Sequence, residues 1–213
     1  MDKKINKYKE EILNKDFILS SASALLLLII SLIINYYAGS FATHNVSNSV
    51  TDIILDNIKT RDVEMVFIYG TLAFWIGTIT ILLIKPKRIP FVLKSIALFI
   101  FIRSASISLT HIAPFAEQIN IPDNRIIHYF TFGGDLFFSG HTGLPFLLAL
   151  IFWDHRIIRY VYLLTSITFA VIVLAGHYHY SIDVFAAFFI TPTIMQLCNL
   201  FFDRDHNLFR SYN

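Results

Sequence analysis

Six long apolar stretches, separated by short polar segments, constrain the fold of this chain more than any other feature of its sequence. A helix that crosses a bilayer needs roughly 20 apolar residues, because the hydrocarbon offers no partners for backbone polar groups. The predicted spans are residues 17–38, 65–84, 89–113, 140–153, 160–177 and 182–202. We therefore predict an all-α integral membrane protein with six transmembrane helices, in which residues 17–202 form the membrane domain.

The composition supports a protein in lipid and narrows its partners. Hydrophobic residues make up 55% of the chain and charged residues 15%, a balance that soluble domains do not have. The net charge of +2 comes from short basic clusters between apolar stretches, which argues against a nucleic-acid partner. The single cysteine, Cys198, excludes an intramolecular disulfide and a cysteine metal site, and we expect it to be a packing residue.

The distribution of lysine and arginine predicts the orientation, because these residues are retained on the cytoplasmic side in short loops. With the N-terminus inside, the outer loops hold Lys59, Arg61 and Arg125, while Lys94 and Arg103 lie within the third span. The cytoplasmic segments then hold Lys3, Lys4, Lys7, Lys9, Lys15, Lys85, Lys87, Arg88, Arg156, Arg159, Arg204 and Arg210. Residues 1–16 and 203–213 are thus predicted to be cytoplasmic segments.

A few ionisable residues lie in or beside the predicted spans, where each one is costly and therefore indicates function. Arg103 lies inside the third span, and the others lie at outer ends of spans: His111, Asp135, His141, His177, His179 and Asp183. Four elements thus converge at one depth, and we expect a site on the periplasmic, lumenal or extracellular side.

His179 and Asp183 are four residues apart, so both side chains share one face if the last helix begins near Tyr178. A carboxylate in this place fixes the tautomer of the imidazole and stabilises its protonated form, as a nucleophilic or general-base histidine requires. The alternative is a structural pair whose two members satisfy each other in lipid.

The sequence Ser139-Gly140-His141-Thr142 opens the fourth span, where Ser139 or Thr142 can cap the helix and Gly140 allows close approach of a ligand. A helix N-terminus favours phosphate, which would place His141 beside a bound anion. A plain capped helix start is the alternative.

The fourth span is short. At about 1.5 Å per residue, residues 140–153 cover roughly 21 Å of a core of about 30 Å. Either Leu136, Phe137 and Phe138 extend this helix, or the Ser-Gly-His turn lies below the outer surface.

Arg103 lies too deep in its span to reach the interface, so it needs an anionic partner. A substrate phosphate is one candidate, since the guanidinium matches its geometry, and Asp135 or Asp183 is the other. His111 and His177 could take part in the chemistry of the site, or they could be ordinary amphipathic side chains at the membrane interface. Both possibilities stay open.

Two segments together resemble the signature motifs of the sphingomyelin synthase family, a branch of the type 2 phosphatidic acid phosphatase (PAP2) superfamily. They are Gly-Asp-Leu-Phe-Phe-Ser-Gly-His-Thr at 134–142 and His-Tyr-His-Tyr-Ser-Ile-Asp-Val at 177–184. The resemblance covers both motifs in order and the span count, and extends loosely to Arg103, whereas the N-terminal third is similar in hydropathy alone. It implies a PAP2-like helical bundle with a His, His, Asp triad on the non-cytoplasmic side.

The resemblance also implies roles for the site residues. His179 would attack the lipid phosphorus to form a phosphohistidine, Asp183 would orient it, and His141 would protonate the departing diacylglycerol oxygen. A ceramide-like alcohol or water would then accept the head group, without a metal or another cofactor. We expect substrate contacts from Arg103, Asp135, Ser139, Gly140 and Tyr180.

Departures from the superfamily pattern bear on the substrate. The sphingomyelin synthase family commonly has a cysteine at the start of the first motif, where this chain has Gly133. The broader superfamily has further cations in an early motif and six residues before the nucleophile, where this chain has Ser104 and Val173. A phosphomonoester carries about two negative charges at pH 7, whereas a diester carries one and needs fewer cations. Fewer cations therefore favour transfer of phosphocholine or phosphoethanolamine between lipids.

Three alternatives to head-group transfer remain open. One is a PAP2-type phosphatase for phosphatidic acid or an isoprenoid diphosphate. Another is a non-enzymatic transporter that uses Arg103 and the histidines as an ion path. In the third, His141, His177, His179 and Asp183 form a zinc site, since their side chains suit that metal.

Overall fold

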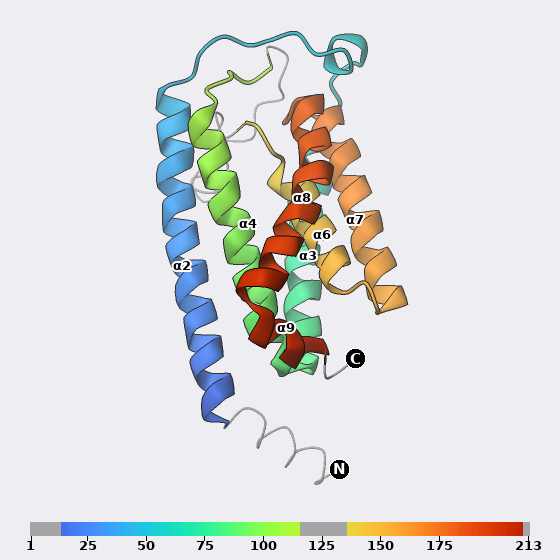
Figure 1. Cartoon of the computed structure of the whole chain (residues 1–213). Coiled ribbons are helices and arrows are strands. Elements are labelled where there is room, and N and C mark those ends of the chain that lie inside the picture. Colours follow the sequence, from blue (N-terminus) through green and yellow to red (C-terminus); the bar gives the residue numbers. More distant parts are fainter. Residues whose placement is uncertain (1–13, 116–135, 211–213) are drawn as a thin grey trace.

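The computed structural model describes residues 14–115 and 136–210, and over these residues the regular structure is helical, without strands (Figure 1). The α-helices are α2 (Lys15–His44), α3 (Glu64–Ile84), α4 (Ile89–Leu109), α6 (Gly140–Ile151), α7 (Arg156–Ala175), α8 (Ser181–Phe201) and α9 (Asp203–Arg210). Two short 3-10 helices, η1 (Leu55–Asn57) and η2 (Pro86–Arg88), precede α3 and α4. The all-α prediction is confirmed.

Five of the described helices are long and apolar enough to cross a bilayer, namely α2, α3, α4 together with η2, α7 and α8. They fit an integral membrane protein, and they match five of the predicted spans to within a few residues, except that α2 continues to His44. The remaining apolar helix, α6, has 12 residues and a length of about 18 Å. The count of six spans is therefore not confirmed.

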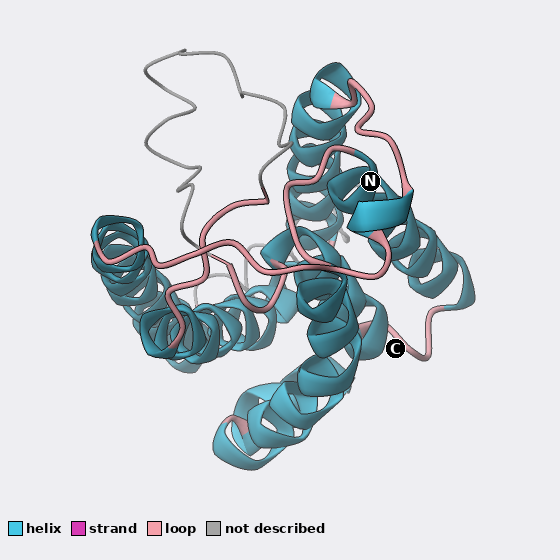
Figure 2. Ribbon diagram, turned by 90° about the horizontal axis from the view of Figure 1, so that it is seen from above, coloured by secondary structure: helices cyan, strands magenta, loops and turns pink. Residues whose placement is uncertain are grey.

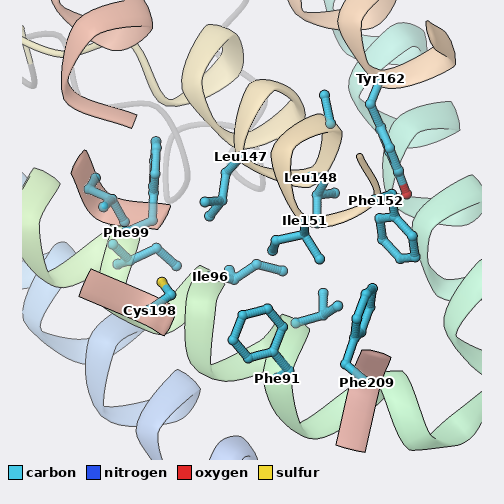
Figure 3. Packing of buried hydrophobic residues seen from close by; sticks show 14 of the residues in the cluster. Phe91, Ile96, Phe99, Leu147, Leu148, Ile151, Phe152, Tyr162, Cys198 and Phe209 are labelled. Atoms are coloured by element: carbon cyan, nitrogen blue, oxygen red, sulfur yellow. The ribbon is translucent and has the colours of Figure 1, made fainter. Parts of the chain in front are cut away.

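The hydrophobic core lies around the first half of α4, at the end of the bundle that holds α9 (Figure 3). Side chains from α4, α6, α8 and α9 meet there, including Phe91, Ile96, Leu148, Phe152, Cys198 and Phe209. Cys198 is fully buried in this cluster, as expected for a packing residue. The opposite end contains two smaller apolar clusters, around Phe67 and around Tyr180, together with polar side chains.

At the same end of the bundle, α9 also makes polar contacts with α4 and α2. Asp205 of α9 accepts hydrogen bonds from Lys94 of α4, at 2.5 Å, and from Ser20 of α2. The guanidinium of Arg88 contacts His155 and lies 5.5 Å above the ring of Phe209. The sequence predicted residues 203–213 as a cytoplasmic tail, and the structure gives residues 203–210 as a helix fixed to the bundle.

The end of the bundle opposite α9 contains the last turns of α2, α4 and α7 and the first turns of α3 and α8 (Figure 1). Helix α6 begins at Gly140, below these ends of the bundle, so Leu136, Phe137 and Phe138 do not extend it. The segment from α2 to α3 crosses the whole face of this end when it is seen from above (Figure 2).

Candidate active site

The predicted His179–Asp183 pair is present. Nδ1 of His179 lies 3.0 Å from Oδ2 of Asp183, and the two residues are 6% and 0% exposed. The prediction that both lie within one helix is wrong: α8 begins at Ser181, so Asp183 lies in its first turn and His179 in the loop before it. The backbone N–H of Tyr180 also donates to Oδ2 of Asp183, at 3.0 Å, which holds the loop against the helix start.

Asp183 also joins the two sequence motifs. Its Oδ1 accepts a hydrogen bond from the N–H of Phe137 at 3.2 Å, and its backbone carbonyl accepts one from the N–H of Ser139 at 3.2 Å. A single buried residue of α8 therefore orients His179 and fixes the start of α6, where His141 lies.

The start of α6 is capped by Ser139, whose Oγ accepts a hydrogen bond from the N–H of Thr142 at 3.4 Å. A Cβ at Gly140 would lie 3.2 Å from Nε of Arg103, and one at Gly143 would lie 2.6 Å from the ring of Phe99. Glycine is therefore required at Gly143 for packing, and at Gly140 it lets the helix start approach a cation closely.

The turn before α6 has an unusual backbone. Phe137 and Phe138 have φ angles of 85° and 78°, a region that bulky residues rarely adopt. This turn excludes the alternative in which they extend α6. The Phe138 ring is fully buried against Phe99, with ring centroids 4.8 Å apart, and its carbonyl accepts a hydrogen bond from Nε of Arg103 at 3.1 Å.

Arg103 is 8% exposed and lies beside the start of α6. Besides the contact with Phe138, its Nη1 donates to Oδ1 of Asn35 at 3.2 Å, and the hydroxyl of Ser104 lies 3.4 Å from the same oxygen. Asn35 lies within the apolar helix α2, and sequence reasoning missed it. Of the two carboxylates predicted as partners of Arg103, Asp183 binds His179, Tyr180 and Phe137, and Asp135 lies outside the described residues.

His141 lies in the first turn of α6, between aromatic rings. Its ring centroid is 4.4 Å from that of Phe67 and 5.8 Å from that of Phe169. Phe67 also packs against Tyr178, the residue before His179, with 5.0 Å between the ring centroids. Phe67 of α3 thus contacts one residue of each motif, His141 and Tyr178.

A cavity of about 190 Å³ lies beside His141, lined by residues of α2, α3, α4, α6 and α7. Arg103, Gly140 and His141 line it together, with Asn35. The rest of its lining comes from apolar and aromatic side chains and from Thr71. The structure therefore brings the predicted cation and one predicted histidine to the same space.

Asp52, in the segment between α2 and α3, is a site residue that sequence reasoning missed. It is 7% exposed, its Oδ2 accepts the N–H of Ser181 at 2.7 Å, and its Oδ1 accepts the N–H groups of Ile54 and Leu55. Burial alone raises the pKa of Asp52, but these hydrogen bonds outweigh it and hold the pKa below its usual value. Asp52 thereby fastens the segment between α2 and α3 to the first residue of α8.

Tyr180 takes part in the same attachment. Its hydroxyl donates to the carbonyl of Ala113 at 2.9 Å and accepts the N–H of Val50 at 3.3 Å. The residue is 1% exposed, and burial raises the pKa of its phenol. These contacts give Tyr180 a role in joining three loops, and its predicted contact with the substrate stays a prediction.

His177 closes the C-terminus of α7. Its φ of 56° is left-handed, the N–H of Tyr178 donates to the carbonyl of Val173 at 2.8 Å, and the N–H of His177 donates to that of Leu174 at 3.1 Å. This is the Schellman geometry, in which glycine normally occupies the left-handed position. Nδ1 of His177 lies 3.3 Å from Oγ1 of Thr60.

His111 lies at the same end of the bundle, with its ring packed against Phe41 at 5.3 Å. Its backbone carbonyl accepts hydrogen bonds from Ser47. Neither His111 nor His177 contacts His179 through a described hydrogen bond, and their participation in chemistry stays open.

The proposed zinc site has no geometric support in the part of the chain that the structure describes. Within residues 14–115 and 136–210, no three histidine, cysteine, aspartate or glutamate side chains gather closely enough to hold a metal ion. His179 and Asp183 contact each other, whereas His177 faces Thr60 and His141 lies between two aromatic rings.

Both motifs lie within one stretch of sequence that matches a protein-family model. Residues 133–200 match the family model of the PAP2 superfamily C-terminal region. The matched residues include His141, His179 and Asp183, and they support the PAP2 superfamily and an enzyme of the lipid phosphatase or phosphotransferase type. No curated protein and no solved structure matches the chain. The narrower resemblance to sphingomyelin synthases is not confirmed by the PAP2 match.

Proposed function

We propose that this protein is a membrane lipid phosphotransferase of the sphingomyelin synthase type. It moves phosphocholine or phosphoethanolamine from a glycerophospholipid to a lipid alcohol or to water through a phosphohistidine at His179. The observation that supports this most directly is the buried contact of 3.0 Å between Nδ1 of His179 and Oδ2 of Asp183. The distribution of basic residues supports a site on the non-cytoplasmic side.

The first step follows from the tautomer of His179. Because the Asp183 carboxylate accepts a hydrogen bond from Nδ1–H, the lone pair is on Nε2, which attacks the lipid phosphorus. The bond between phosphorus and the diacylglycerol oxygen breaks, and His141 donates a proton to that oxygen. Diacylglycerol leaves, and the head group remains bound to Nε2.

The second step reverses the roles. His141, now neutral, accepts the proton of an incoming hydroxyl group, whose oxygen attacks the phosphorus and releases His179. A ceramide-like alcohol gives a new phospholipid, and water gives the free phospho-head group.

Charge supports a diester as substrate. Among the described residues that line the cavity beside His141, the permanently charged cation is Arg103. A single guanidinium matches the one negative charge of a phosphodiester better than the two charges of a monoester.

Trapping the intermediate tests the proposed nucleophile. The purified full-length protein is exposed briefly to phosphatidylcholine labelled in its phosphate, then denatured in alkali and mapped by mass spectrometry. We expect the phospho-head group on His179, and none in His179→Ala, while His44→Ala, a change of an exposed histidine at the end of α2, keeps the label. Unchanged activity of His179→Ala would overturn His179 as the nucleophile. A wild type that reacts with no phospholipid would instead favour a non-enzymatic transporter.

Product analysis separates transfer from hydrolysis of a monoester. Labelled phosphatidylcholine is incubated with the protein, with and without ceramide, and the lipids are resolved by thin-layer chromatography. A new labelled phospholipid that depends on ceramide supports the transferase. Release of inorganic phosphate from phosphatidic acid, without any reaction of phosphatidylcholine, would replace it with a PAP2-type phosphatase.

A further inference from the structure

We propose that the cavity between α2, α3 and α4 binds one hydrocarbon chain of the phospholipid substrate, which enters from the bilayer between α2 and α3. This inference rests on the proposed function, because it assigns the chain-binding part of the same site.

The two ends of the cavity differ in chemistry. Arg103, Gly140 and His141 line one end, at the start of α6. Leu144, Ile100 and Trp75 line it farther along their helices, toward the middle of the bundle. A cation at one end and an apolar lining beyond it match a lipid whose anionic head lies at His141 and whose chain points inward.

The polar groups of the lining do not contradict an apolar occupant. The hydroxyl of Thr71 donates to the carbonyl of Phe67 in its own helix, at 2.7 Å, and the amide oxygen of Asn35 accepts hydrogen bonds from Arg103. Both groups therefore have partners in the protein, and a hydrocarbon chain beside them leaves neither without a hydrogen bond.

The packing of the helices leaves a lateral opening. Helix α2 packs along α4 and α3 packs on α7, while α2 and α3 do not form a packed pair in the described structure, although both line the cavity. Leu32 of α2 is 51% exposed, so the lining reaches the outer surface of the bundle at this helix. Lipid can thus enter sideways, without leaving the bilayer.

The size of the cavity limits its occupant. Its volume of about 190 Å³ is smaller than the pockets of roughly 300–1,000 Å³ that enclose a whole small ligand. It therefore holds part of one chain, and the second chain of a glycerophospholipid remains in the surrounding lipid.

A variant that fills the cavity tests this assignment. Thr71→Phe places a ring in the cavity, and Leu72→Phe places the same ring on the neighbouring residue, which is 55% exposed and does not line the cavity. We expect Thr71→Phe to lower kcat/KM for a long-chain phospholipid about tenfold or more while sparing a short-chain, micelle-forming analogue. Leu72→Phe should resemble the wild type with both substrates.

Photo-crosslinking gives a second readout that does not depend on turnover. The wild type and both phenylalanine variants are placed in phosphatidylcholine vesicles that contain a phospholipid with a diazirine midway along one chain. We expect adducts on peptides that contain Trp75 and Ile100, lost in Thr71→Phe and retained in Leu72→Phe.

Two results would overturn the chain site. One is equal loss of long-chain and short-chain turnover in a folded Thr71→Phe protein. The other is a set of adducts spread over outward-facing residues such as Leu25 and Ile76, and unchanged by Thr71→Phe. A wild type that turns over neither lipid while its adducts map to the cavity would reject the proposed function and leave the chain site intact.

Discussion

Asp183 accepts hydrogen bonds from three donors with one carboxylate: the ring of His179, the N–H of Tyr180 and the N–H of Phe137. The first orients the proposed nucleophile, and the other two hold the loop before α8 and the turn before α6. The orientation of His179 and the conformation of the two loops therefore depend on the same side chain. Its removal should affect both, and a conservative replacement can separate them.

Asp183→Asn is the conservative replacement. The amide keeps the size of the side chain but can donate to Nδ1 of His179, which selects the wrong tautomer. By analogy with the aspartate of serine protease triads, we expect kcat to fall by about 10⁴. Turnover of labelled phosphatidylcholine measures the effect, and Asp154→Asn, at an exposed position of the turn between α6 and α7, serves as the control. A folded Asp183→Asn protein with wild-type kcat would refute the role of the carboxylate.

Part of the site could be predicted at this scale because the information is local. The spacing of His179 and Asp183 and the cap at Ser139 depend on a few neighbouring residues, and both contacts are observed. Asn35 and Asp52 could not be found in this way. Each contacts a segment more than 60 residues away, so its importance depends on how the helices and loops are arranged.

At the scale of elements, the segment between α2 and α3 acts as a strap across the end of the bundle that contains the site (Figure 2). Asp52 binds Ser181 at the start of α8, and the N–H of Arg61 donates to the carbonyl of Ala175 at the end of α7, at 2.8 Å. These contacts lie on both sides of the loop that contains His179. The strap therefore limits the movement of that loop.

Asp52→Ala tests the strap. The variant loses an N-cap type interaction at α8, which is typically worth about 1 kcal/mol. We expect a corresponding fall in thermal stability and faster amide exchange in residues 177–181, measured by mass spectrometry. Asp56→Ala is a less informative comparison because Oδ2 of Asp56 accepts a hydrogen bond from the N–H of Asp52. Asp62→Ala, at an exposed position, is the better control. Unchanged exchange in residues 177–181 would contradict the attachment.

The lowered pKa of Asp52 adds a pH dependence to the same variant. Because the folded pKa lies below the ordinary value of 3.8, the contribution of the carboxylate to stability is complete above that value. It is lost as the pH falls through the folded pKa. The difference in stability between wild type and Asp52→Ala should therefore be constant near neutral pH and shrink below about pH 4.

At the scale of the whole molecule, the two ends of the bundle differ in the side chains that they contain. One end holds the aromatic core around Phe91 and Phe152 and the contact of Lys94 with Asp205, and the other holds the polar site. The apolar stretches predicted this bundle well, because hydrocarbon leaves few alternatives for such sequences. The docking of α9 was not predicted, since its residues are mainly polar and their role depends on partners in α4 and η2.

The Lys94–Asp205 contact should stabilise the bundle only as a pair. Asp205→Leu leaves a largely buried ammonium without its carboxylate, and we expect a loss of about 3 kcal/mol. The double variant Lys94→Met/Asp205→Leu removes both charges and should regain most of that loss. Thermal unfolding in detergent measures both, and a double variant that is no more stable than Asp205→Leu would argue against the pair.

The sunken start of α6 also bears on the lipid itself. With 12 residues and a cap that bonds to the first turn of α8, this helix matches a thinner layer of hydrocarbon than its neighbours do. A phospholipid whose phosphorus reaches His141 must therefore stand lower than the lipids around it. Hydrophobic mismatch, which membrane proteins usually relieve by tilting or by deforming the bilayer, becomes here a means of drawing one lipid deeper than the rest of its leaflet.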